Sequence, residues 1–565
     1  MTTLWNATYS TPVYLYAASS VLLLGACAFV YHVFALSEPK IPKGLRAAPS
    51  PPGARLFSGH SHIYSGQVTN NPSESQLVKW AEELGEIYQI QMGTQRWVIL
   101  SSPEAIKVSF IDGSAVPRSI LMETSKEVFD RQGTLTSSRA VNRVAMGVLS
   151  GGYRMLFMGT KPYGKQWRDI RAIVHRCLTV KSADGMKPSQ DLESRRYLYD
   201  LLTEPANFWN HVKRYSTSVI MYATYGRRIL TVEDPVLNDI YTETAIFGEC
   251  FGQLHLVDQY PILENLPRSL QWWRKKYEPY HQKELQLWLG LWSTLKSQMA
   301  KGIHTGCFAE KFMENDYPKM GISENQAAYV AGTMIEAGSD TTQLTLNSLI
   351  LGLVAFPETV QKAHEELDRV VGDRMPTFED FDRLPYIRAM VKEVLRWRTA
   401  SNDHFQHLTT GDVVYKDYFI PAGSYVIGNV WALNFDPVMF PDPQRFNPDR
   451  YLDTMANNMT AGECINVNNP RQRDHWGFGA GRRVCAGYNL AENSLFILTA
   501  RLLWAFDVRA PIDEATGKPL EYDLWDFPAT NMFGPKPFRA EFKVRDSERE
   551  KQILAGLDAF RGDFS

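Results

Sequence analysis

The sequence of 565 residues predicts a mainly α-helical protein with small β-sheets, in which an N-terminal transmembrane helix precedes one large domain. Three observations support this fold class. Helical periodicity dominates long segments such as residues 326–356 and 385–397, whereas strand-like runs are short. Beyond residue 60 we find no internal repeat, low-complexity tract or second linker. Residues 13–36 carry no charged side chain.

The N-terminal elements are predicted from charge and proline content. As a helix, residues 13–36 would span about 36 Å, enough to cross the ~30 Å hydrocarbon core of a bilayer. Lysines and arginines follow this segment and none precedes it, so residues 1–12 are expected in the lumen and the large domain in the cytosol. Five prolines make residues 37–60 a stiff, non-helical stalk. Residues 61–565 then form the domain.

The body of the chain contains strand-like runs at residues 88–101, 413–428 and 539–545. A net charge of −2 gives no electrostatic reason to expect nucleic acid as a partner. The six cysteines form no Cys-x-x-Cys pair and have no regular spacing, which argues against a structural zinc site and against a disulfide framework. The abundant aromatic residues suit a large core or an apolar pocket.

The stretch GFGAGRRVCAG, residues 477–487, places one cysteine among four glycines. A phosphate-binding loop would need a preceding strand and a following β/α series, and neither is predicted. A nucleophilic cysteine would need a base and a third group, and it leaves the glycines unexplained. A thiolate ligand explains more positions, because glycines let a bulky planar group approach the backbone and Cys485 precedes a helix starting near Gly487. All three interpretations remain open on this stretch alone, and the ligand is favoured.

Five residues of this stretch resemble the haem-binding signature of the cytochrome P450 family: Phe478, Gly481, Arg483, Cys485 and Gly487. The resemblance implies the cytochrome P450 fold and haem b as cofactor. By the same resemblance, Cys485 is the axial ligand of the haem iron and Arg483 meets a haem propionate. Phe478 is implied to pack near the thiolate, and Gly487 to let the next helix pass close to the porphyrin.

The stretch AGSDTT, residues 337–342, lies in a long apolar helical segment, where an acid next to a hydroxyl is locally unfavourable. It resembles the oxygen-activating motif of the family. The resemblance implies that Asp340 and Thr341 relay protons, and that Ala337 and Gly338 leave room for oxygen. The alternative interpretation is a solvated helix face.

Two other segments resemble family motifs, in the family's order. Trp167 and Arg171, four residues apart, resemble a Trp-Arg-x-x-Arg helix that hydrogen-bonds a propionate, and His407 is implied as another propionate contact. Glu393 and Arg396 are neighbours on one helix face. With Arg445 they resemble a structural Glu-Arg-Arg cluster behind the haem loop. After this helix the family commonly has a proline and apolar residues, whereas this chain has polar residues, among them Ser401, Asn402, Asp403 and His404. These residues would either line the substrate pocket or form a solvated turn.

The resemblance implies a haem-thiolate monooxygenase that inserts one oxygen atom from O2 into a small apolar organic substrate. No flavin or nicotinamide motif is found, so NADPH would supply electrons through a separate NADPH–cytochrome P450 reductase, with cytochrome b5 as a further candidate donor. The chain resembles microsomal fungal members of secondary metabolism, which implies an endoplasmic reticulum membrane and an aromatic or polyketide-like substrate. The alternatives are a haem-thiolate isomerase or dehydratase, and a non-catalytic haem-binding membrane protein.

Overall fold

The computed structural model describes most of the domain and short pieces of the predicted anchor. Residues 1–12, much of the anchor at 13–36, and Asn402, Asp403 and His404 lie outside the described residues. Within the described part, no single helix is long and apolar enough to cross a membrane; one pair of helices bent by 101° passes by length and composition together. The described residues are 19–20, 22–27, 29–31, 39–65, 71–107, 133–139, 141–156, 163–401, 405–528 and 532–556.

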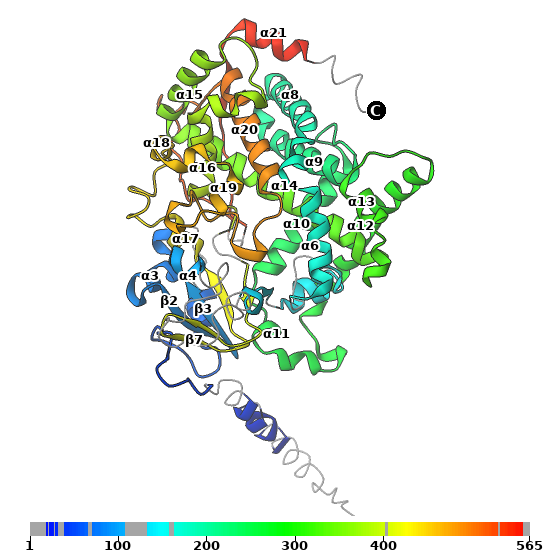
Figure 1. Cartoon of the computed structure of the whole chain (residues 1–565), viewed down its shortest axis with the longest axis vertical. Coiled ribbons are helices and arrows are strands. Elements are labelled where there is room, and N and C mark those ends of the chain that lie inside the picture. Colours follow the sequence, from blue (N-terminus) through cyan, green and yellow to red (C-terminus); the bar gives the residue numbers. More distant parts are fainter. Residues whose placement is uncertain are drawn as a thin grey trace, which may run out of the picture.

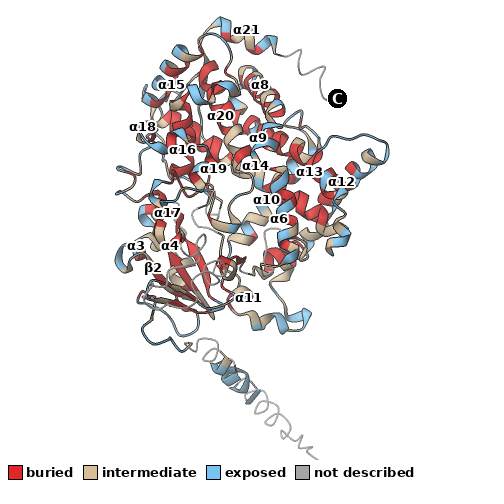
Figure 2. Cartoon of the chain, in the orientation of Figure 1, coloured by how far each residue is buried: buried red, intermediate tan, exposed pale blue. Residues whose placement is uncertain are grey.

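Helix α14 (Glu324–Ala355) runs through the middle of the helical part (Figure 1). It begins with a capping box, in which Ser323 and Gln326 satisfy each other's backbone N–H groups, and it ends just before Pro357. It packs against α9, α12, α16 and α20, and its buried residues form part of the main core (Figure 2). The other helices with described bounds are α2 (Ser61–Ser65), α3 (Gln76–Leu84), α4 (Pro103–Ile106), α6 (Lys165–Cys177), α7 (Val180–Asp184), α8 (Lys187–Thr203), α9 (Phe208–Tyr225), α10 (Pro235–Gly252), α11 (Leu256–Gln259), α12 (Arg274–Ala300), α13 (Phe308–Glu314), α15 (Pro357–Val370), α16 (Pro385–Trp397), α17 (Val430–Asn434), α18 (Asp449–Leu452), α19 (Ala461–Ile465), α20 (Tyr488–Ala505) and α21 (Ser547–Ala555).

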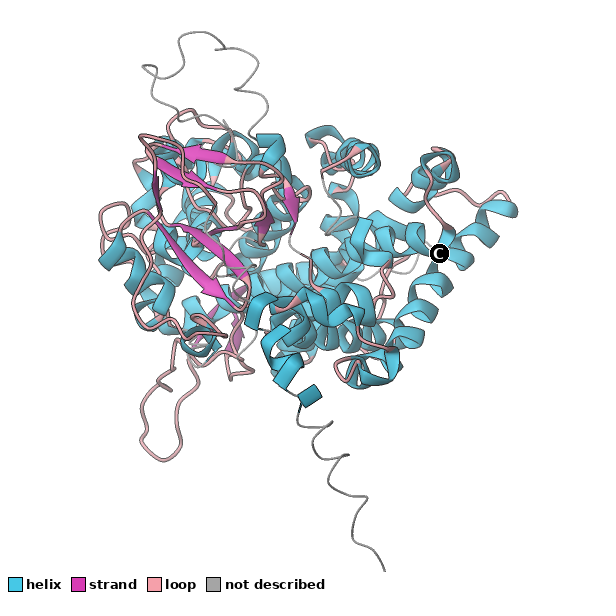
Figure 3. Cartoon of the chain, turned by 90° about the horizontal axis from the view of Figure 1, so that it is seen from below, coloured by secondary structure: helices cyan, strands magenta, loops and turns pink. Residues whose placement is uncertain are grey.

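Most of the strands gather on one side of the helices (Figure 3). The described sheets have the orders β2-β3-β8-β5-β4, β1-β7-β6 and β10-β9. The predicted strand runs correspond to β2 with β3, to β6 through β8, and to β10, so a mainly helical chain with small sheets is confirmed. The strands are β1 (Arg46–Ala47), β2 (Ile87–Met92), β3 (Gln95–Leu100), β4 (Ser138–Arg139), β5 (His407–Leu408), β6 (Val413–Tyr415), β7 (Tyr418–Ile420), β8 (Tyr425–Gly428), β9 (Phe506–Arg509) and β10 (Glu541–Val544).

The predicted stalk is non-helical from residue 39 onward, and part of it joins the domain. Strand β1 pairs in parallel with β7, and Ala48 beside it is buried. His60 hydrogen-bonds the Pro51 carbonyl oxygen at 3.0 Å. The Gln91 N–H donates to His60 Nδ1 at 3.0 Å, so residues 46–48 and residue 60 are joined to the body of the protein. The boundaries of the anchor, stalk and domain remain predictions.

Candidate active site

A cavity of about 390 Å³ lies among α6, α9, α10, α14, the start of α20 and residues 477–487. The folded chain thus brings together segments that are more than 300 positions apart in the sequence. Gly481 belongs to the loop but does not line the cavity. The predicted site residues that do line it are Trp167, Arg171, Ala337, Gly338, Asp340, Thr341, Ser401, His407, Phe478, Arg483, Cys485 and Gly487.

The glycine-rich loop presents Cys485 to this cavity. Gly479 and Gly481 have φ angles of 71° and 65°, a left-handed conformation that favours glycine. The turn they form lets the Cys485 N–H donate to the Phe478 carbonyl oxygen at 2.9 Å. Gly487 caps the N-terminal end of α20, as the sequence predicts. Burial raises the pKa of the Cys485 thiol, whereas the Gly487 N–H and the nearby Arg171 lower it. A cation next to the sulfur would favour the thiolate further.

Three guanidinium groups meet on one side of the cavity. Arg139, Arg171 and Arg483 all line it, and among the described residues none of them pairs with a carboxylate. Arg483 donates from Nε to the Ser137 carbonyl oxygen at 2.7 Å and stacks on the Trp167 ring, with 3.9 Å between Cζ and the ring centroid. Burial, and then the charge of Arg171, lower the pKa of Arg483 to about 9.

This cluster fits a dianionic ligand. The Arg483 Nη2 atom is buried and has no hydrogen-bond partner within the described part of the chain. Burial and the two neighbouring arginines hold the pKa of Arg139 well below its usual value. Like charges without a counter-ion are costly in such a place, and carboxylates such as the two propionates of haem would offset that cost. A thiol beside three guanidinium groups, one of them with an unpartnered nitrogen, therefore suits haem. The sequence gives Arg139 no motif, so only the fold could reveal it.

Helix α14 supplies the acid and the hydroxyl. Burial raises the pKa of Asp340 to about 6, Lys213 on α9 opposes this rise, and Glu336 adds to it. Thr341 Oγ1 donates to the Ala337 carbonyl oxygen at 2.6 Å. A Cβ atom on Gly338 would come within 2.5 Å of Ile220 Cγ1 on α9. The glycine is therefore required where two helices approach closely, in addition to lining the cavity.

A model of the cytochrome P450 family matches residues 49–527, which is most of the chain. The chain belongs to the cytochrome P450 family. Similar curated proteins include the cytochrome P450 monooxygenases verL of Clonostachys rogersoniana (36% identical; 86% of this chain, 86% of the relative), virE of Hypocrea virens (33%; 90% and 88%) and pgmC of Aspergillus terreus (36%; 83% and 82%). The chain is thus a cytochrome P450 monooxygenase, and the family implies a haem-thiolate cofactor with its iron, redox partners and a small-molecule substrate.

One predicted member of the structural cluster of this P450 is wrong. Arg396 binds the buried Glu393 with Nε and Nη2, both at 2.7 Å. Arg445 instead pairs with Glu358 on α15, and 49% of its side chain is exposed. The third arginine is Arg450, which donates from Nε to Glu393 Oε1 at 3.1 Å and is 7% exposed. Both lie in similar Pro-x-Arg-aromatic stretches, and the second of them, at 448–451, is the signal that identifies Arg450.

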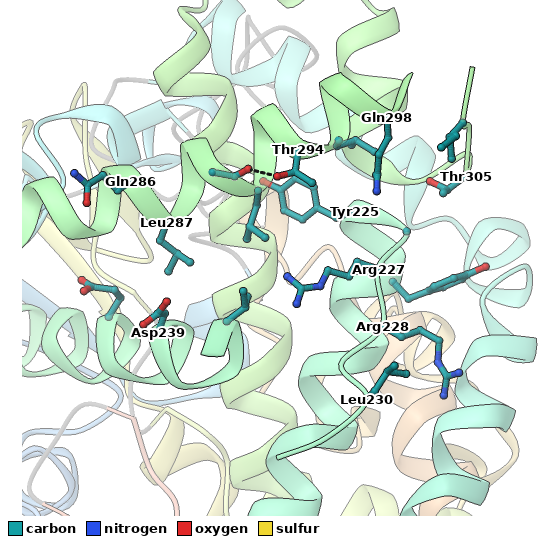
Figure 4. Close-up of a pocket in the computed structure, with 18 of the residues that line it drawn as sticks. Tyr225, Arg227, Arg228, Leu230, Asp239, Gln286, Leu287, Thr294, Gln298 and Thr305 are labelled. Atoms are coloured by element: carbon teal, nitrogen blue, oxygen red, sulfur yellow. Dashed lines mark hydrogen bonds between the residues drawn. The ribbon is translucent and has the colours of Figure 1, made fainter. Parts of the chain in front are cut away.

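The P450 domain also has an outer cavity of about 1230 Å³, between the C-terminal end of α9, α10 and α12 (Figure 4). None of the predicted site residues that the structure describes lines it, and its arginines are engaged: Arg227 pairs with Asp234 at 2.9 Å and Arg228 with Glu193 at 2.6 Å. Beside it, His304 Nδ1 lies 2.5 Å from Glu310 Oε1. Glu310 also accepts the backbone N–H groups of Thr305 and Gly306, so the pair of His304 and Glu310 holds the loop before α13.

Proposed function

We propose that this P450 inserts one oxygen atom from O2 into a small apolar organic substrate. One observation supports the proposal above all others. The thiol of Cys485, a group of arginines that have no carboxylate partner in the described part of the chain, and the Asp340–Thr341 pair all border a single cavity. Each feature alone has an ordinary structural explanation, but together they provide an iron ligand, a binding site for propionates and a proton donor.

In this proposal Cys485 ligates the haem iron, and Arg139, Arg171 and Arg483 bind the propionates with Trp167 and His407. Haem bound through a thiolate supplies the chemistry that activates oxygen. In the proposal Phe478, which also lines the cavity, packs near the sulfur. Its ring centroid lies 5.1 Å from that of His475. The protein's part is to hold the sulfur as an anion, exclude water and orient the substrate.

Asp340 and Thr341 manage protons. With its pKa raised to about 6, Asp340 can both bind and release a proton near neutral pH. Thr341, the next residue, keeps its hydroxyl on the cavity side of α14 while it donates to the Ala337 carbonyl oxygen. The oxygen of that hydroxyl still has lone pairs that can accept a hydrogen bond from a proton donor. This pair also favours oxygen insertion over an isomerase or dehydratase, which needs no proton delivery to oxygen.

The remaining elements of the proposal come from the chain's resemblance to other P450s. Electrons come from NADPH through a separate reductase, with cytochrome b5 as a second donor. Residues 13–36 anchor the protein in the endoplasmic reticulum membrane by a single pass, with the catalytic domain on the cytosolic face. The substrate is an aromatic or polyketide-like intermediate of fungal secondary metabolism, which accords with fungal relatives and with Phe247, Phe251 and Phe405 in the cavity wall.

Turnover with purified reductase, NADPH and isotopically labelled O2 tests the reaction. The product should contain one labelled oxygen atom. An unlabelled isomer or dehydration product formed without reductase would contradict the proposal.

Cys485→Ser tests the ligand. The variant should lose the long-wavelength Soret band of the reduced carbon monoxide complex, because that band requires a thiolate on the iron. Cys177→Ser, which changes a half-buried cysteine near the end of α6, is the matched control and should keep the band. A Cys485→Ser protein that retained the band would show that the iron ligand lies elsewhere.

A further inference from the structure

Helices α10 and α14 form one wall of the cavity, and this wall carries a charged residue, Glu336, that has no part in the proposed reaction. Glu336 lines the cavity one helical turn before Asp340, yet it is almost completely buried. Arg154 donates from Nη2 to Glu336 Oε1 at 2.5 Å and binds the second oxygen of Glu336 with Nη1. The same guanidinium pairs with Glu284, which accepts a 2.9 Å hydrogen bond from the Tyr329 hydroxyl.

This buried cluster has more acid than base. Two carboxylates, those of Glu284 and Glu336, share the single guanidinium of Arg154. Burial raises the pKa of Glu336, although Arg154 opposes the rise. Each carboxylate oxygen can accept more than one hydrogen bond, and Arg154 uses one position on each oxygen of Glu336. Glu336 therefore keeps unused acceptor capacity at the edge of the cavity.

A second polar group lies nearby on α10. Thr244 lines the cavity, and its Oγ1 atom is buried without a hydrogen-bond partner among the described residues. Thr333 offers a direct comparison, because it also lines the cavity but donates its hydroxyl to the Tyr329 carbonyl oxygen at 2.8 Å. A buried hydroxyl without a partner is unfavourable, so Thr244 is the group that gains from a polar ligand.

Aromatic rings of α10 and of the segment after α16 line the same cavity. The rings of Phe247 and Phe251 are stacked, with centroids 5.7 Å apart and an interplanar angle of 22°. Phe405 meets Phe251 edge-on, at 5.6 Å and 64°. The guanidinium of Arg154 lies 4.2 Å from the centroid of Phe247, which links this aromatic surface to the charged cluster. The cavity wall therefore combines aromatic rings with hydrogen-bond acceptors.

We propose that Glu336 and Thr244 recognise a hydrogen-bond donor, an O–H or N–H group, on a planar apolar substrate whose ring lies against Phe247 and Phe251. The inference rests on the proposed function, because it places the substrate in the same cavity. Glu336 and Asp340 are separated by four residues, or about 6 Å along the helix. The oxidised position of the substrate is therefore expected about one helical turn from its donor group.

Spectral titration of the full-length, haem-loaded protein tests this assignment. The probes are naphthalene, 2-naphthol and 2-naphthylamine, which share a ring and differ in the donor, and the shift of the Soret band reports binding. In the unchanged protein a donor-bearing probe should bind about ten-fold more tightly than naphthalene, since a hydrogen bond to a charged group has roughly that effect. Thr244→Val should reduce the preference about five-fold, and Glu336→Gln should reduce it further.

Thr333→Val is the matched control and should leave the preference unchanged, because its hydroxyl is already used by the backbone. Preference for either the alcohol or the amine supports the proposal and identifies the donor. Naphthalene binding as tightly as both donors, no binding of any probe, or an unchanged preference in Thr244→Val would overturn it. The spectrum of the reduced carbon monoxide complex distinguishes failure of the proposed function from failure of this inference. If the thiolate band is absent from the unchanged protein, the proposed function fails. If that band is present but the preference is absent, only this inference fails.

Discussion

The role of each buried arginine, in the cavity wall or in the structural cluster, can be judged by its partner. Arg396 and Arg450 have Glu393, whereas the partners of Arg139, Arg171 and Arg483 among the described residues are backbone oxygens and aromatic rings. Buried cations are stable when they are paired with an anion. The two arginines bound to Glu393 therefore indicate a structural ion-pair cluster, and the three without a carboxylate indicate a site for an anionic ligand. The difference lies in the surroundings and not in the residue type.

The corrected structural cluster leads to a prediction about single residues. Arg450→Ala should lower the free energy of unfolding by about 3 kcal/mol, because it leaves part of the buried Glu393 charge uncompensated. Arg445→Ala is the control and should cost no more than about 1 kcal/mol, because its pair with Glu358 is half exposed. Unfolding midpoints of both variants measure the difference. Equal losses of stability, or a larger loss for Arg445→Ala, would contradict the assignment of Arg450 in place of Arg445 to the cluster.

At the level of elements, the packing of α9 on α14 determines which residues α14 can present to the cavity. Gly338 stands where Ile220 comes closest, so the spacing of these two helices depends on the missing side chain. Two positions further along the same helix, Asp340 faces the cavity and is near Lys213 of α9. The contact between α9 and α14 therefore determines where the Asp340 carboxyl lies in the cavity.

Gly338→Ala tests this contact. The added methyl group would meet Ile220 and should destabilise the fold by about 1–3 kcal/mol. Gly248→Ala on α10 is the matched control, because Gly248 also lines the cavity but a Cβ atom there has no neighbour within 4 Å. The control should be neutral or stabilising by about 1 kcal/mol. Ile220→Ala should restore part of the stability of Gly338→Ala, and a lack of any such coupling in thermal unfolding would argue against the contact.

The junction of α10, α12 and α14 should respond to pH through Glu243. Burial, followed by the charges of Glu284 and Glu336, raises its pKa to about 7, while Lys283 and Arg154 oppose the rise. A raised carboxyl pKa means that the folded state holds the proton more tightly than the unfolded state. This contribution to stability is complete below about pH 4.5 and is lost as the pH rises through about 7.

Glu243→Gln removes this titration and keeps the shape of the side chain. Between pH 5 and 8 the melting temperature of the unchanged protein should fall more steeply than that of the variant. Glu249→Gln is a control on the same helix, because Glu249 is exposed and its pKa is lowered, chiefly by Lys276. Parallel melting curves for the unchanged protein and Glu243→Gln would contradict the assignment.

For the whole molecule, strands from distant parts of the chain are as important as the helices. Strand β1 from the predicted stalk pairs with β7, more than 370 positions later, and β4 pairs with β5 from the segment after α16. The latter pairing places Arg139 and His407 opposite each other. The small sheets therefore complete the rim of the proposed propionate site as well as holding the N-terminal part of the domain.

Two truncations distinguish anchor from domain. Deleting residues 1–38 should weaken membrane binding, measured by sedimentation with vesicles, and should leave the carbon monoxide spectrum intact. Deleting residues 1–48 also removes β1 and the buried Ala48, and should lower the yield of haem-loaded protein. Loss of haem from the shorter deletion would instead make the anchor part of the fold.

Much of this protein is determined by local sequence. The helices of residues 326–356 and 385–397 were predictable because their apolar spacing and flanking residues act within a few turns, and α14 and α16 match them closely. The Cys485 loop was predictable because its glycines satisfy a requirement of the backbone. The polar segment after α16 shows the limit, since Thr399 and Ser401 line the cavity and residues 402–404 lie outside the described residues.

Only the tertiary structure decided the partners of charged groups. Arg139 has no motif, Arg445 and Arg450 stand in similar stretches, and Glu336 and Arg154 are 182 positions apart. Local spacing establishes which residues share a helix face, but it carries no information about the side chain that a distant segment brings into contact. Because burial and pairing set the free energy of a charge, the roles of these residues were fixed only when the helices packed.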